Sequence, residues 1–162
     1  MSFKEHNATQ KRFLIRTYSD LPKIEKVLST IAKKNNVPLQ LSILGQLTTD
    51  KGITKKEITK IIADIKQQLS AVLGEQFQFG YFHNPEIGSL FIAGHLTPTF
   101  LNKIDKRELA SLPTGLLGIF KGLGIDVEEI NNYLDELKNE NYCLIIRGEN
   151  SVLNTIEPML NV

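Results

Sequence analysis

The sequence predicts an α/β (α+β) domain built on a ferredoxin-like, split β-α-β sheet of four or five strands, mixed or antiparallel, with helices packed on it and an inserted helix and hairpin. Three patterns carry this prediction. A strand, an amphipathic helix and a second strand follow one another over residues 12–47. A hairpin pattern occupies residues 77–95, and a capped helix runs into an apolar strand over residues 126–149. Helices beside strands at both ends, with a hairpin between, are typical of a sheet that helices cover on one face.

The first unit begins with residues 12–18, which are rich in β-branched and aromatic side chains and therefore favour a strand. Asp20 then stands where a helix N-cap is expected, and Pro22 lies in the first turn, where its missing N–H is harmless. Residues 39–47 alternate between apolar and polar, which predicts a strand with one buried face. Between these strands, up to a turn at Asn35-Asn36, apolar side chains recur at helical spacing: Ile24, Val27, Leu28 and Ile31.

The longest predicted helix follows a turn at residues 50–52. Thr54 and Glu57 have the spacing of a capping box, in which each side chain bonds a free backbone N–H of the first turn. The helix continues to Gly74 with one apolar side, formed by Ile58, Ile61, Ile62, Ile65, Leu69 and Val72.

Two strands, at residues 77–82 and 89–95, flank a loop at 83–88 that contains Asn-Pro and Gly. They predict an antiparallel hairpin. Within the first strand, Phe77, Phe79 and Tyr81 point to one face and Phe82 points to the other. We therefore expect both faces of this strand to be covered and its aromatic residues to belong to the core.

The last unit begins at Asp126, which with Glu129 three residues later predicts a second capping box. Residues 142–149 read as a buried strand, and the single cysteine, Cys143, is expected to be a buried inert thiol within it. Asn150 and Ser151 are expected to cap a short final helix. Residues 97–113 have prolines near both ends, which limits any helix there to a short one.

Composition places the chain among ordinary globular domains. Its 162 residues predict one domain over residues 11–162, preceded by a flexible tail at 1–10. Nineteen basic against eighteen acidic residues give a net charge of +1, so the charge favours no nucleic-acid partner. The lone cysteine, the absence of an apolar signal region and the absence of a long apolar run predict a cytoplasmic protein.

Three segments resemble one family in their order and residue types: Phe13–Leu21, Gly122–Tyr133 and Cys143–Asn150. They resemble the bacterial general stress (heat-induced) protein family of unknown function, over roughly half of the chain. The resemblance implies a strand-helix-strand unit joined through a glycine-rich middle to a helix-strand-helix unit, with no catalytic motif. The family's long glycine zipper is reduced here to four residues, Gly115, Gly118, Gly122 and Gly124.

The glycine-rich segment has three interpretations. A short buried helix ended by glycine caps is favoured over a helical dimer interface at Gly115, Gly118 and Gly122, because the apolar run before Lys121 is short. Contact with a membrane is disfavoured for the same reason.

Weak candidates for a metal site are His83, Glu86 and His95, which would lie close together if the hairpin paired its ends. Since the chain has no HxH, HxxxH or HExxH spacing, we predict no metal and no cofactor. Ser89 and Ser111 lack the GxSxG pattern of a hydrolase nucleophile.

The sequence therefore predicts a protein that is not an enzyme and that acts by self-association or contact with another protein. The expected interface is a free sheet edge or the glycine-rich helix. The alternative is a small-ligand-binding or regulatory domain with a cleft near the 77–95 hairpin, where Tyr81, His83 and Arg147 would supply the polar groups. An unrecognised enzyme is the third option.

Overall fold

The computed structural model describes residues 9–34, 38–48 and 53–161. Most of the predicted tail and the turns predicted at 35–36 and 50–52 lie outside these residues. Seven strands are present among the described residues: β1 (Lys11–Tyr18), β2 (Gln40–Thr48), β3 (Phe79–Asn84), β4 (Gly88–Gly94), β5 (Lys103–Ile104), β6 (Arg107–Glu108) and β7 (Tyr142–Glu149). The helices are α2 (Leu21–Lys34), α3 (Lys55–Leu73), α4 (Thr97–Leu101), α5 (Gly115–Gly122), α6 (Val127–Lys138) and α7 (Asn150–Ile156), with the 3-10 turns η1 (Leu109–Ser111) and η2 (Glu157–Leu160).

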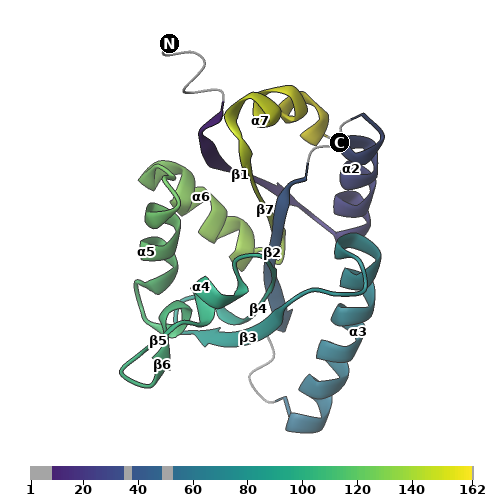
Figure 1. Ribbon diagram of the computed structural model, residues 1–162. Helices are drawn as coiled ribbons and strands as arrows, with labels where there is room; N and C mark the ends of the chain where they lie inside the picture. The colour runs from purple at the N-terminus through teal and green to yellow at the C-terminus, as the bar shows by residue number, and fades with distance from the viewer. Residues whose placement is uncertain (1–8, 35–37, 49–52, 162) are drawn as a thin grey trace.

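The main sheet has five strands in the order β1-β7-β2-β4-β3, and every neighbouring pair is antiparallel (Figure 1). β1 and β2 are therefore parallel to each other, joined by α2, with β7 inserted between them. This is the split β-α-β arrangement that the sequence predicts, so the fold class is confirmed. β5 and β6 form a separate two-stranded sheet.

Helices cover both faces of the sheet, whereas we expected them on one face. The apolar residues of α2, α3 and α7 pack against one face, and those of α4, α5 and α6 pack against the other (Figure 1). The inner strands explain this difference. β4 and β7 bury consecutive residues, such as Phe91 beside Ile92 and Leu144 beside Ile145, so both of their faces are apolar and each face needs a cover.

Two of the predicted helix caps are confirmed and two are wrong. The Asp20 carboxylate accepts from the Lys23 N–H at 2.9 Å, and the Thr54 hydroxyl accepts from the Glu57 N–H at 3.2 Å. Asp126 has the extended backbone of an N-cap but its side chain makes no capping bond. The expected caps Asn150 and Ser151 are instead the first two residues of α7, and Glu149 occupies the N-cap position without a side-chain bond. The acidic residues in the first turn of α6, Glu128 and Glu129, still interact favourably with the partial positive charge at the N-terminus of that helix.

The predicted hairpin is confirmed as β3 and β4, joined by residues 85–87. Asn84 fixes this loop, because its side-chain oxygen accepts from the Glu86 and Ile87 N–H groups at 2.9 and 3.2 Å. Its amide nitrogen donates to Ala110 O at 2.9 Å and so ties the hairpin to η1. Residues 97–113, where any helix was expected to be short, form the five-residue helix α4, the β5-β6 pair and η1.

Substitutions at Gly74 and Gly94 test how closely the end of β4 approaches β2. Gly94 has φ +103°, and a Cβ there would lie 2.2 Å from Leu41 O, whereas Gly74 has φ +88° with nothing within 4 Å. Gly74→Ala should lower the free energy of unfolding by about 1–3 kcal/mol through backbone strain alone, because φ +88° with ψ 175° is a conformation that side chains other than glycine avoid. Gly94→Ala should cost clearly more, because the strand must also move. Equal losses in urea denaturation would contradict the close approach.

Candidate functional site

The two outer strands, β1 and β3, differ in how their free backbone edges are satisfied. In β1 the Asn150 N–H donates to Gln10 O at 2.8 Å, in register with the β1-β7 pairing. Because hydrogen bonding alternates along an antiparallel strand, the even-numbered residues of β1 bond β7 and the odd-numbered ones face outward. The outward groups of β1 therefore belong to Lys11, Phe13, Ile15 and Thr17.

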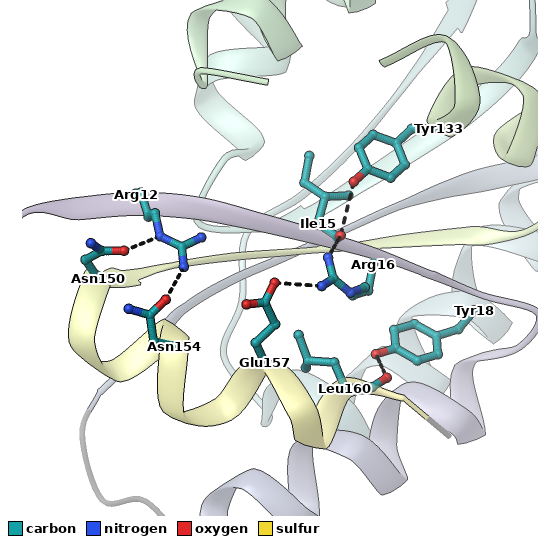
Figure 2. A network of polar contacts seen from close by, with 9 residues as sticks. All are labelled: Arg12, Ile15, Arg16, Tyr18, Tyr133, Asn150, Asn154, Glu157 and Leu160. Carbon is teal, nitrogen blue, oxygen red and sulfur yellow. Dashed lines mark hydrogen bonds and ion pairs between the residues drawn. The ribbon is translucent and has the colours of Figure 1, made fainter. Parts of the chain in front are cut away.

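The middle of the β1 edge is capped from both faces of the sheet. Ile15 O accepts from Arg16 Nη1 at 2.9 Å and from the Tyr133 hydroxyl at 3.3 Å (Figure 2). Arg16 is itself held by an ion pair between its Nη2 and Glu157 Oε1, at 2.9 Å. Burial raises the pKa of Tyr133, Glu129 raises it further and Arg16 opposes the rise. The tyrosine thus keeps its proton and stays a donor at neutral pH.

The C-terminal helices contact side chains at both ends of β1. Arg12 donates to the side-chain oxygens of Asn150 and Asn154, and the Tyr18 hydroxyl donates to Leu160 O at 2.6 Å (Figure 2). Burial raises the pKa of Tyr18, with Arg16 opposing the rise. Charged side chains and local caps of this kind are how proteins protect an edge strand from pairing with another chain. Among the described residues, Ile15 O is thus the outward backbone group of β1 that receives hydrogen bonds, and side-chain contacts with the C-terminal helices flank it at both ends of the strand.

The β3 edge is open. The Gly94 N–H donates to Gln78 O at 2.9 Å, in register with the β3-β4 pairing, so the even-numbered residues of β3 bond β4. The N–H and C=O groups of Phe79, Tyr81 and His83 then face outward. Within the described part of the chain, no hydrogen bond reaches these outward groups. They are available to an added strand.

The side chains at this edge are aromatic and uncharged. Tyr81 is 51% exposed, the largest fraction among the large hydrophobic side chains that the structure describes. Our expectation that both faces would be covered there is therefore wrong at Tyr81. Phe79 stacks on Phe91 with ring centroids 5.9 Å apart, and Lys66 Nζ lies 5.0 Å from its ring. β3 contains no Lys, Arg, Asp or Glu to discourage pairing.

The three weak metal candidates do not form one site. His83 pairs with Ser89 near the turn, whereas His95 follows the far end of β4, six residues further along. At the rise of an antiparallel strand this is roughly 20 Å. The hairpin pairs as predicted, but its register places the two histidines at opposite ends. Among the residues that the structure describes, no group of three His, Cys, Asp or Glu could hold a metal ion.

The residues proposed for a ligand cleft are also apart. Tyr81 and His83 share the α3 face of β3 with Phe79, since side chains alternate along a strand. Arg147 lies on the opposite face with Cys143 and Ile145, at the other end of the sheet. There its Nη1 donates to Gln40 Oε1 at 2.7 Å, and its guanidinium lies 5.9 Å from the Phe13 ring centroid.

The three interface glycines divide into two environments. Gly115 is buried, and a Cβ there would lie within 1.9 Å of Leu109 O, so this glycine allows α5 to pack on η1. Gly118 and Gly122 are exposed, and a Cβ added at either would meet nothing within 4 Å. They leave a small open face on an eight-residue helix that also carries the exposed Lys121.

A cavity of about 370 Å³ lies beside the start of the hairpin, lined by Leu39, Leu41, Leu73, Phe77, Gln78 and His95 among others. Its lining is about half polar, with Gln76, Gln78 and His95 beside the leucines and Phe77. Cys143 is buried elsewhere in the core, as predicted, and burial raises the pKa of its thiol well above the ordinary value. A thiol in that environment is unreactive.

Comparison with known proteins gives no relative for this chain: no protein-family model, no curated protein and no solved structure matches it. In the described part of the chain, none of the helices has the length and apolar character needed to cross a lipid bilayer.

Sequence reasoning missed the difference between the two edges. Arg16 carries a weak signal, since a charged residue within an apolar strand is typical of an edge. The donor Tyr133 stands 118 residues away from Ile15, so only the packing of α6 beside β1 reveals their contact.

The buried tyrosines predict a loss of stability in alkali. Burial raises the pKa of Tyr18, Tyr133 and Tyr142, so the folded protein keeps protons that the unfolded chain loses above about pH 10. Stability is then complete below that pH and falls as the pH rises through the folded-state values. Urea denaturation at a series of pH values should show this fall. Tyr18→Phe should show a shallower one, and identical pH dependence in the two proteins would contradict the prediction.

Proposed function

We propose that this domain acts by binding protein rather than by catalysis, and that it binds by accepting an extra strand at the free edge of β3. The open backbone of Phe79, Tyr81 and His83 carries the proposal. Each of these residues offers an N–H and a C=O with the spacing that an antiparallel strand requires.

The contrast with β1 supports the assignment. Both strands are at an edge, yet Arg16 and Tyr133 cap Ile15 O at the middle of β1, whereas no described residue caps an outward group of β3. Long uncapped aromatic edges invite pairing, and β3 also lacks the charges that usually prevent it. A capped edge and an uncapped edge in the same sheet favour the interpretation that the uncapped edge, β3, binds another strand.

Energetics favour an added strand modestly. Each backbone hydrogen bond contributes a net ~0.5–1.5 kcal/mol, and an aromatic pair adds a similar amount. Covering Tyr81 also removes apolar surface from water. Association then costs part of this gain through lost translational and rotational freedom. We therefore expect binding to be specific in register but moderate in strength.

The non-enzymatic part of the proposal rests on how the polar residues are used. The candidate acids and bases of the hairpin are spread along it, and Arg147 is engaged by Gln40 and Phe13. The resemblance to the bacterial general stress protein family stays a prediction, and strand addition does not depend on it.

A small-ligand-binding function is the second candidate, favoured by the cavity beside the hairpin, whose lining combines apolar side chains with Gln76, Gln78 and His95. A ligand that binds only the folded state raises the melting temperature with its concentration. A thermal-shift screen against metabolites, with Leu73→Trp as the variant that fills the cavity, distinguishes this function from strand addition at β3. Shifts lost in Leu73→Trp would favour the second candidate.

A peptide that copies residues 78–84 tests strand addition directly. Added to the isotope-labelled protein, it should move the amide NMR signals of Phe79, Tyr81 and His83 most, because these N–H groups would gain a bond. The amides of β1 should stay unchanged.

Tyr81→Pro is the matched variant, because it removes an outward N–H and leaves the inward bonds of β3 to β4 in place. It should abolish the effect of the peptide. As a control, Ile104→Lys removes a similarly exposed apolar side chain, 47% exposed, away from the edge and should bind as the unmodified protein does. Signals that move only at β1, or equally in Tyr81→Pro, would overturn the proposal.

A further inference from the structure

Resting on the proposed function, the geometry points to a specific partner: we propose that the strand added to β3 is β3 of a second copy of this chain, paired antiparallel about a twofold axis at Tyr81. The joined sheet would run continuously through both subunits. This assigns both the partner and the register of the edge contact.

The register follows from which backbone groups are free. The outward residues Phe79, Tyr81 and His83 are symmetric about their middle member. With Tyr81 opposite its own copy, Phe79 faces His83 of the partner subunit and His83 faces the partner's Phe79. Every free N–H and C=O of the three residues then has a partner, and each pair exchanges two hydrogen bonds. A shift of two residues would leave some of these groups unpaired.

The side chains agree with this register. All three lie on the α3 face of the sheet, and a twofold axis perpendicular to the sheet keeps the two α3 faces on the same side. The cross-strand neighbours are tyrosine with tyrosine and phenylalanine with histidine, aromatic pairs that stabilise antiparallel strands. No carboxylate, lysine or arginine of β3 meets its own copy, so no like charges oppose pairing.

The other edge limits the assembly to two copies. A chain with two open edges would add strands without end and form fibres. Because Arg16 and Tyr133 cap Ile15 O at the middle of β1, pairing there would have to break both bonds, so β3 is the favoured edge and the contact closes on itself as a dimer. A six-residue strand pair covers less surface than a permanent dimer buries. The dimer should therefore be concentration-dependent.

Opposite charges placed at position 81 test the twofold axis. Analytical ultracentrifugation from micromolar to millimolar protein concentration measures the dimer dissociation constant. The unmodified protein should dimerise. Tyr81→Lys alone and Tyr81→Glu alone should each raise the dissociation constant about tenfold or more, since like charges then face each other across a strand pair. An equal mixture of the two variants should restore dimers. Circular dichroism confirms that both variants fold, and Ile104→Lys should dimerise as the unmodified protein does.

Cysteine cross-linking tests the register. Residues directly opposite have Cα atoms about 5.5 Å apart, within the span of a disulfide. Under mild oxidation, Tyr81→Cys should form disulfide dimers about tenfold faster than His83→Cys, whose own copy would lie four residues away along the strand. The native Cys143 is buried and does not interfere.

Each outcome decides between the two proposals. A monomer at all concentrations overturns the second copy as partner, and if the 78–84 peptide still binds, strand addition at β3 survives. A dimer that Tyr81→Lys does not weaken, or that the mixture does not restore, overturns the axis at Tyr81. Equal cross-linking by His83→Cys overturns the register. Loss of both peptide binding and dimerisation defeats both proposals.

Discussion

Backbone hydrogen bonding at the sheet edges is the constraint on which the rest of this structure depends. The inner strands β7, β2 and β4 satisfy their N–H and C=O groups on both sides, whereas β1 and β3 each have one side without a strand. At β1 the protein supplies substitutes, drawn from β1 itself, from α6 and from the C-terminal helices. At β3 it supplies none from the described residues. The bonds of Arg16 and Tyr133 to Ile15 O and the exposure of Tyr81 both reflect this asymmetry.

Three crossover connections build the sheet, and two of them explain why both of its faces are covered. The third, through α3, joins the parallel strands β2 and β3 around β4 and lies on the same face as α2. β1 and β2 are parallel with β7 between them, and β4 and β7 are parallel with β2 between them. These two crossovers use strands that run in opposite directions, and they move across the sheet in opposite directions. A rotation by 180° about the sheet normal would therefore superpose them, so two crossovers of the same hand would lie on the same face. Here the crossovers lie on opposite faces, so their hands differ. Since about 98% of such crossovers are right-handed, one of them departs from the rule. The long β4-to-β7 connection, with three helices, places α5 and α6 where a ferredoxin-like sheet is normally bare.

Local pattern was sufficient to predict the elements, because it depends on neighbours in sequence. The spacing of Ile24, Val27 and Ile31 identifies α2, and the hairpin follows from Asn-Pro and Gly between two apolar runs. The face that a helix covers depends on handedness, which no residue of α6 encodes by itself. The metal candidates failed for a related reason: pairing of the hairpin was predictable, but its register, which places His83 beside Ser89 and leaves His95 beyond the far end, sets the distance.

The candidate site shows the same division between local and distant information. That β3 is aromatic and uncharged can be read from the sequence, yet the same pattern is equally typical of a buried strand, and Phe79 and Phe82 do pack inward. What distinguishes Tyr81 is position in the strand order: β3 is last, and α3 reaches Phe79 through Lys66 without covering Tyr81. An inner strand with this sequence would be core. At an edge, its backbone geometry makes it a surface for binding a strand, and the capped carbonyl at the middle of β1 favours that binding at β3.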